Sequence, residues 1–293
     1  MIDRRRFLQM LLGSAAGFFS LGGYAFAVEP RHRLSVAEYD LALPRWPAGA
    51  PPLKVALLSD IHISDPWMPL ERVEHIVATA NSLDVDVILL LGDYLAGVPG
   101  FRRVPIEAMA AALGQLQAPL GVHAIMGNHD YRWRRTPTPL VGALRAAGID
   151  VLLNQSRRIR GHGHDFWLAG TESALAGGLD GSDGRDDLDA TLAGVDGERP
   201  VVLMAHEPTQ FESVSDRVAV TFSGHTHGGQ VALPLIGAPV SHHSTVHGWV
   251  RGHYVHQGRH LVVTSGLGMS LLPIRFMVPP EIAVVTLRAA TVA

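Results

Sequence analysis

Five short motifs carry side chains that can bind metal ions, and each follows an apolar stretch. They are Ser59-Asp60-Ile61-His62, Gly92-Asp93-Tyr94, Gly127-Asn128-His129-Asp130, Ala205-His206-Glu207-Pro208 and Gly224-His225-Thr226-His227-Gly228-Gly229-Gln230. Aspartate, asparagine and neutral histidine suit divalent metals such as Mn, Fe or Zn. The motifs therefore predict a metal centre whose ligands come from five separate places in the chain.

The spacing within two motifs lets pairs of ligands converge. Alternate side chains of an extended segment point to the same side, so Asp60 can converge with His62, and His225 with His227. A lone aspartate after glycine, as at Asp93, is well placed to bridge two ions. Two ions about 3.5–4 Å apart can hold a hydroxide and clamp both oxygens of an in-line displacement. Each motif alone is common in turns, but the five in this order predict a two-metal centre.

The motifs require alternating strands and helices to position them. Apolar runs predict buried strands at residues 53–59, 85–91, 121–126, 151–153, 201–205 and 218–223. Apolar residues at helical spacing predict helices around residues 73–83, 106–116 and 140–147. This alternation is typical of βαβ units in a parallel or mixed sheet, whose strands deliver ligand-binding residues at their carboxyl ends. After Gln230, short strands separated by glycine and proline are expected.

The domain plan is simple, because no repeat and no second-domain linker is evident. One catalytic domain is expected over residues 53–293. A proline-rich lead-in at residues 28–52 precedes it, with one short strand expected near residues 34–41.

The composition excludes several classes of protein. Of 293 residues, 47% are hydrophobic, which is enough for a sizeable core and argues against disorder. The chain has no cysteine, which excludes a disulfide scaffold, a thiolate zinc site and a cysteine nucleophile. Its formal charge of −3 argues against a general nucleic-acid binder, because such domains usually carry a basic face, so no nucleic-acid partner is expected.

The N-terminus has the order of an export signal. Arg4-Arg5-Arg6-Phe7-Leu8-Gln9 resembles a twin-arginine motif, an uncharged stretch follows, and Ala25-Phe26-Ala27 suits signal peptidase. We therefore expect residues 1–27 to be a twin-arginine signal peptide that engages the Tat export machinery. The alternative is an uncleaved membrane anchor. Either case predicts a periplasmic, extracytoplasmic or membrane-associated protein.

The order of the motifs resembles the calcineurin-like metallophosphoesterases, over about residues 53–287. Within that family the chain is most similar to the exported bacterial group of the YkuE and YaeI phosphoesterases. Residues 223–231 and the Pro273-Ile274-Arg275-Phe276 stretch of the tail support the subgroup. The resemblance implies an α/β (α+β) fold of the metallo-dependent phosphatase type, a two-sheet mixed β-sandwich flanked by helices with a dimetal site at one edge.

The resemblance also implies a ligand set for two divalent ions, which would be Mn, Fe or Zn. The first ion would be held by Asp60, His62, Asp93 and His227, and the second by Asp93, Asn128, His206 and His225. Asp93 would bridge them. Many family members carry a further Asp or Arg shortly after Gly-Asp, and residues 94–97 have neither. Phosphate contacts from that loop are therefore not expected.

Three further residues are candidates for catalysis or substrate binding. His129 resembles the family histidine that contacts the phosphate and protonates the leaving oxygen, and Asn128 would help to stabilise the phosphoryl charge. Asp130 is expected to orient the His129 ring. Arg275 would either reach a phosphate or pair with Glu281.

The expected activity is hydrolysis of a phosphodiester or pyrophosphate bond by a dimetal-bound hydroxide. The export signal favours a cell-envelope or lipid-linked phosphoester as the substrate. A UDP-2,3-diacylglucosamine-type pyrophosphate hydrolase is one alternative, although that substrate is cytoplasmic. A second alternative is a non-catalytic module that binds envelope phosphates. A nuclease is disfavoured, because the chain shows no basic stripe.

Overall fold

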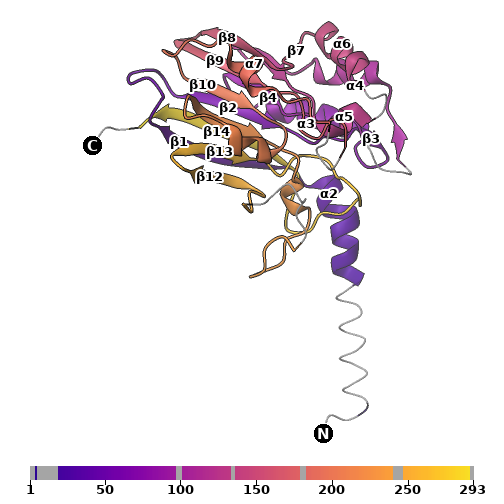
Figure 1. Ribbon diagram of the computed structural model, residues 1–293. Helices are drawn as coiled ribbons and strands as arrows, with labels where there is room; N and C mark the ends of the chain where they lie inside the picture. Colours follow the sequence, from indigo (N-terminus) through magenta and orange to yellow (C-terminus); the bar gives the residue numbers. More distant parts are fainter. Residues whose placement is uncertain are drawn as a thin grey trace.

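Two six-stranded mixed sheets pack face to face, with helices on their outer sides (Figure 1). This arrangement is seen in a computed structural model that describes residues 4, 19–96, 101–132, 136–178, 183–239 and 247–290. It confirms the expected two-sheet mixed sandwich flanked by helices. The strands that precede the five motifs all lie in these two sheets.

The first sheet places the last strand of the chain next to the earliest ones. Its spatial order is β1 (Ser35–Leu43), β14 (Glu281–Ala289), β2 (Leu53–Leu58), β4 (Val87–Leu90), β6 (Val122–Ala124) and β7 (Asp150–Val151). Strand β14 is parallel to β1 and antiparallel to β2, whereas β2, β4, β6 and β7 run parallel to one another. The strand expected near residues 34–41 is therefore present as an edge strand.

The second sheet has antiparallel edges and a parallel centre. Its order is β12 (Gly252–His256), β13 (Arg259–Val263), β11 (Val218–Ser223), β10 (Val201–Met204), β9 (His164–Gly170) and β8 (Gln155–Gly161). Strands β9, β10, β11 and β13 are parallel, while β8 and β12 pair antiparallel at the edges. Sequence analysis missed the β8–β9 hairpin, because β8 is largely polar and half-exposed.

Strand residues alternate between two cores, as the pleat of a strand requires. Val55 and Leu57 on β2 pack between the two sheets with residues such as Phe222. Ala56 and Leu58 point to the other side and join the core under the helices. A strand buried on both faces has a continuous apolar run, which explains why these strands were predictable.

The predicted helices cover the outer face of the first sheet. They are α3 (Leu70–Asn81), α4 (Ile106–Leu113) and α6 (Thr138–Ala146). In α3, Val73, Ile76, Val77 and Ala80 form the buried stripe at the expected helical spacing. The remaining short elements are β3 (Ser64–Asp65), β5 (Arg102–Arg103), α5 (Asn128–Arg132), α7 (Leu188–Leu192), and the 3₁₀ turns η2 (Pro208–Ser213) and η3 (His227–Gly229).

The N-terminal segment leaves the domain as a helix. Residues 19–23 are helical and continue into the π-helix η1 (Tyr24–Val28) and α2 (Glu29–His32) (Figure 1). Most of the predicted export signal, residues 1–3 and 5–18, lies outside the described residues, so the signal stays a prediction. Within the described part of the chain, every helix is too short or too polar to cross a membrane.

Candidate metal centre

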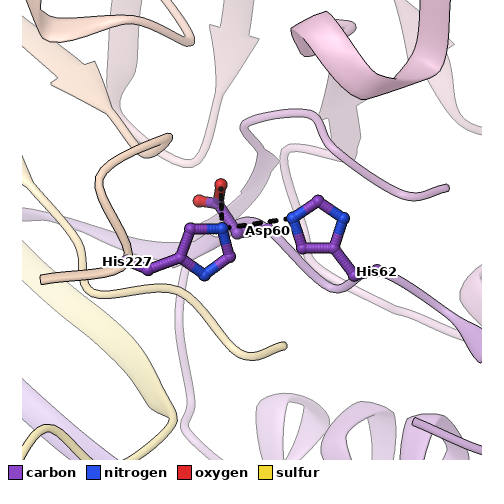
Figure 2. Close-up of side chains that lie close together, drawn as sticks. All are labelled: Asp60, His62 and His227. Atoms are coloured by element: carbon purple, nitrogen blue, oxygen red, sulfur yellow. Dashed lines mark hydrogen bonds and ion pairs between the residues drawn. The ribbon is translucent and has the colours of Figure 1, made fainter. Parts of the chain in front are cut away.

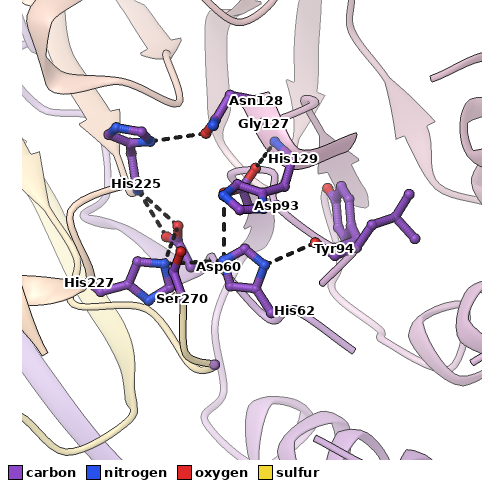
Figure 3. Close-up of polar contacts among 12 residues, drawn as sticks. Asp60, His62, Asp93, Tyr94, Gly127, Asn128, His129, His225, His227 and Ser270 are labelled. Atoms are coloured by element: carbon purple, nitrogen blue, oxygen red, sulfur yellow. Dashed lines mark hydrogen bonds and ion pairs between the residues drawn. The ribbon is translucent and has the colours of Figure 1, made fainter. Parts of the chain in front are cut away.

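The structure brings the seven predicted metal ligands together at one edge of the sandwich. They follow the carboxyl ends of β2, β4, β6, β10 and β11, and all are buried. Their ligand atoms form overlapping groups within 4.8 Å: Asp60, His62 and His227; His62, Asp93 and His129; and Asp93, His206 and His225. Asn128 joins the last group, because its Oδ1 lies 3.1 Å from His225 Nδ1 (Figure 3). Asp93 links the two ends of the cluster, as a bridging ligand must.

The backbone turns sharply at five of these ligands. Asp60, His62, Asp93, His225 and His227 have φ values of 53°, 48°, 58°, 67° and 52°, in the left-handed region. Residues other than glycine rarely adopt this conformation, which costs roughly 1–3 kcal/mol for each residue. The turns aim successive side chains into one place immediately after each strand. Strain concentrated on the polar residues of one cluster is typical of a functional site.

Backbone carbonyl groups orient two of the histidine rings. His62 Nδ1 lies 2.9 Å from the Leu95 carbonyl oxygen, and His206 Nδ1 lies 2.6 Å from that of Leu91. A carbonyl oxygen only accepts, so Nδ1 carries the proton in both rings. The Nε2 lone pair of each neutral ring is then directed into the cluster, which is the arrangement of metal-binding histidines.

The Nε2 atoms of His206 and His62 lie close to other atoms that carry lone pairs. His206 Nε2 is buried without a hydrogen-bond partner and lies 3.3 Å from Asp93 Oδ2. His62 Nε2 lies 3.1 Å from His227 Nε2, which is itself 3.4 Å from Asp60 Oδ1 (Figure 2). Such atoms are stable side by side only with a positive charge between them, either a proton or a metal ion. The residues therefore fit a pair of divalent cations.

Protons compete with cations at the Asp93–His206 pair. Burial alone would lower the pKa of His206, but the Asp93 carboxylate outweighs it and raises that pKa well above its usual value. Burial likewise opposes ionisation of Asp93, yet His206 and His129 hold its pKa well below the ordinary range. In the metal-free protein a proton on His206 thus supplies the positive charge that the Asp93 carboxylate needs.

Metal affinity is expected to rise with pH at the His206 end of the centre. A cation must displace the proton from His206 before it can bind there. Because the pKa of His206 is raised, the proton still competes with the cation at pH values where an ordinary histidine is already neutral. Release of one proton for each ion bound changes the affinity about tenfold for each pH unit. Calorimetric titration of the metal-free chain with Mn²⁺ at pH 6.5, 7.5 and 8.5 measures this. An affinity independent of pH would contradict the assignment of His206.

Asp130 has a different task from the expected orientation of the His129 ring. Its carboxylate accepts hydrogen bonds from the backbone amides of Asp93, Tyr94 and Gly127, each at 2.9 Å, and of Leu95 at 3.1 Å. Burial and the nearby Asp93 raise its pKa to about 7, while the amides of Gly127 and Leu95 act in the opposite direction. Neighbouring residues on a helix do not face each other, which explains why Asp130 turns from His129 toward the loop after β4. It acts as a positioning residue for that loop.

Arg275 is completely buried and serves neither of the two expected roles in this structure. Its guanidinium donates to the carbonyl oxygens of Gly268, Val278 and Ser265, at 2.9, 3.0 and 2.8 Å. Its Nη2 also lies 3.5 Å from His227 Nδ1. Arg275 therefore holds the loops behind His227 together.

Glu207 is a buried residue to which sequence analysis gave no role. Its carboxylate accepts hydrogen bonds from the Ser173 hydroxyl, from the Ala174 amide at 3.1 Å and from the Gln210 side chain at 3.0 Å. It thereby ties the segment after β9 to the residue that follows His206. Its place in the fourth motif was the available signal, but its partners are distant in the sequence.

Gly127 is required because the loop after β6 contacts the loop after β4 at the Gly127 Cα. A methyl group there would press against Asp93 Oδ1 and lie 2.6 Å from the Asp93 amide nitrogen and 2.7 Å from the His206 ring. Side chains packed this tightly cannot give way without displacing ligands.

Gly127→Ala is expected to lower the free energy of unfolding by about 1–3 kcal/mol and to reduce bound metal. Gly142→Ala is the matched control, because Gly142 lies in α6 with nothing within 4 Å of the added methyl. In a helix that change stabilises by about 0.5–1 kcal/mol. Thermal unfolding and metal analysis of both variants measure the difference. Equal metal content in the two variants would contradict the tight-contact argument.

Comparison with known proteins gives a consistent result. A family model described as calcineurin-like phosphoesterase matches residues 53–229, which include all seven predicted ligands. "Uncharacterized metallophosphoesterase YkuE" of Bacillus subtilis is 31% identical over 294 residues, 98% of each chain. "Phosphodiesterase YaeI" of Escherichia coli is 31% identical over 298 residues, 98% of this chain and 100% of that one. An "Uncharacterized metallophosphoesterase" of Aquifex aeolicus is 28% identical over 264 residues, 87% of this chain and 92% of the relative.

Proposed function

This chain belongs to the calcineurin-like phosphoesterase family, and on that premise we propose that it hydrolyses phosphodiester or pyrophosphate bonds of a cell-envelope or lipid-linked substrate. The observation that carries the proposal is the buried cluster of opposed ligand atoms, in which His206 Nε2 faces Asp93 Oδ2 and His62 Nε2 faces His227 Nε2. Two divalent ions bound there would polarise the phosphoryl oxygens and activate a water molecule as the nucleophile.

In this proposal His129 supplies the proton that the leaving group takes up. The residue is 7% exposed, and its ring lies edge-on to the His62 ring, with centroids 4.8 Å apart. Its backbone amide donates to Asp93 Oδ1 at 2.8 Å, which fixes the start of α5 against the cluster. An imidazole N–H at this position can protonate an alkoxide as it departs. Asn128, one residue earlier, would help to orient the phosphoryl group.

The diester preference, the envelope substrate and the metal ion are each supported by a separate observation. The name of the Escherichia coli relative supports a diester substrate. The predicted signal at residues 1–27 supports an envelope substrate, because twin-arginine export would carry the folded protein out of the cytoplasm. Mn²⁺ is proposed as one suitable ion, since carboxylate, amide and imidazole ligands accommodate it.

The test is a comparison of substrates on the full-length chain. The protein is purified metal-free, titrated with Mn²⁺, and assayed with bis-p-nitrophenyl phosphate and with p-nitrophenyl phosphate. Turnover that appears with metal and is faster for the diester is the expected result. A faster monoester reaction would contradict the diester assignment. Two bound ions without turnover of either probe or of envelope phospholipids would favour the non-catalytic binding module instead.

A further inference from the structure

Exposed apolar side chains are concentrated at one end of the molecule. Twelve large apolar side chains are exposed in the described part of the chain, and ten of them fall on three segments. The segments are residues 19–28, 233–236 and 271–277. Leu235 is fully exposed, and Ile236 and Leu271 are 70% and 68% exposed. Such a concentration of exposed apolar groups marks an interaction surface.

The three segments are joined by hydrogen bonds, although they are far apart in the sequence. The Arg275 amide donates to the Ala25 carbonyl at 3.0 Å, and the Val278 amide donates to the Glu29 carboxylate at 2.7 Å. The Ala232 amide donates to the Phe276 carbonyl at 2.9 Å. Figure 1 shows the loops after β11 and β13 beside the N-terminal helix, at the end where that helix leaves the domain. The segments that carry the exposed apolar groups therefore lie side by side at this end of the molecule.

Arginine side chains border this surface. Arg31, Arg33 and Arg72 line a pocket of 390 Å³ together with Trp67, and Glu71 is the one carboxylate in its lining. Arg31 lies over the Trp67 ring, 5.4 Å from its centroid, and Trp67 contacts Phe26 of the N-terminal helix. Arg72 Nη2 donates to the Arg33 carbonyl oxygen at 3.1 Å, which holds these two residues side by side. Three guanidinium groups around one pocket, with a single carboxylate in its lining, suit an anion such as a phosphate.

We propose that this end of the molecule docks on an anionic phospholipid bilayer. The apolar side chains of residues 233–236 and 271–277 enter the bilayer interface, and Arg31, Arg33 and Arg72 bind lipid phosphates. An apolar surface bordered by arginine and tryptophan matches the interface of a bilayer, which is apolar beneath an anionic headgroup layer.

The docking surface adjoins the metal centre. Gln230, which hydrogen-bonds to the 270–276 loop, is three residues after His227, and Arg275 from that loop reaches His227. Docking would therefore place the centre beside the membrane, where a lipid phosphoester is the nearest substrate. This consequence rests on the proposed function, whereas the docking surface itself does not.

The absence of cysteine makes a direct test possible. A single cysteine is introduced as Leu235→Cys in the full-length chain and labelled with the environment-sensitive fluorophore NBD. The control is Gly142→Cys on α6, at the end of the molecule away from the N-terminal helix (Figure 1). Both proteins are added to vesicles of phosphatidylglycerol and phosphatidylcholine in equal parts, and to vesicles of phosphatidylcholine alone. Some vesicles carry a doxyl quencher on the acyl chains.

We expect the label at residue 235 to shift to shorter wavelength and to be quenched at least twofold by the doxyl lipids in the anionic vesicles. The label at residue 142 should stay in water. A second variant with Arg31→Glu and Arg33→Glu in the Leu235→Cys chain should lose the quenching. An N-terminal segment that merely tethers the domain would leave both labels in water and would overturn the proposal. Quenching of both labels alike, or equal quenching without anionic lipid, would also overturn it. None of these readouts needs turnover, so failure of the proposed reaction would be seen separately.

Discussion

Asp93→Asn is expected to abolish turnover and to remove most of the bound metal. Asp93 Oδ2 lies 3.3 Å from His206 Nε2 and 3.6 Å from His62 Nε2, so one carboxylate serves both halves of the cluster. The amide of asparagine keeps the size of the side chain but removes its charge and one ligand oxygen. Because both ions lose a charged ligand, we expect kcat/KM to fall on the order of 10³-fold or more. Metal analysis after dialysis, together with diester turnover, measures both effects.

Asp150→Asn is the matched control for this experiment. Asp150 is partly buried and, like Asp93, is paired with basic side chains, Arg157 at 3.0 Å and His123 at 3.3 Å, but it lies outside the metal centre. Its variant should keep two ions and nearly full activity, with only a modest loss of stability. A fully active Asp93→Asn protein with two ions would remove Asp93 from the centre. Equal losses in both variants would indicate a general effect on folding.

His129→Gln is expected to slow the reaction according to the leaving group. If His129 protonates the departing oxygen, a diester with an alkyl leaving group should lose about 10²–10⁴-fold in kcat. A p-nitrophenyl diester should lose about tenfold or less, because p-nitrophenolate departs without a proton. Glutamine retains a hydrogen-bonding group of similar length. The two rates are measured on the same metal-loaded preparation.

Metal content separates the possible roles of His129. Its ring belongs to the group formed with His62 and Asp93, so a ligand role would show as lost metal. A role limited to binding the phosphate would slow both substrates equally. Only loss of leaving-group protonation gives a large difference between the two diesters at unchanged metal content. An equal loss for both substrates would rule out the proton-donor role.

Much of the centre was accessible from sequence because its signals are local. Each buried strand is a short apolar run, and the ligands follow within two to four residues of the strand end. Asp60 and His62 after β2, and His225 and His227 after β11, are examples. Apolar stripes identified α3, α4 and α6 in the same way. Patterns of this kind depend on periods of two or 3.6 residues, which a single sequence displays directly.

Tertiary structure alone decided the features that depend on distant partners. Strand β14 lies between β1 and β2, and nothing in its own composition specifies those neighbours. The carbonyl groups of Leu95 and Leu91 orient His62 and His206. Every residue has a backbone carbonyl, so the sequence does not show which one makes such a contact. Arg275 is a candidate substrate contact by sequence, but its guanidinium donates to backbone carbonyls behind His227.

One physical reason separates the features that the sequence predicts from those that only the tertiary structure shows. The sequence by itself determined the types of the ligands, the strands that carry them and the metal chemistry they suit. Residue types and the spacing of apolar residues along a strand or helix can be read directly from a single sequence. Only the tertiary structure decided which atoms face each other, such as His206 Nε2 and Asp93 Oδ2. It also decided that three remote segments with exposed apolar side chains lie side by side. Backbone groups and long-range packing establish these relations, and neither depends on residue type in a way that a single sequence reveals.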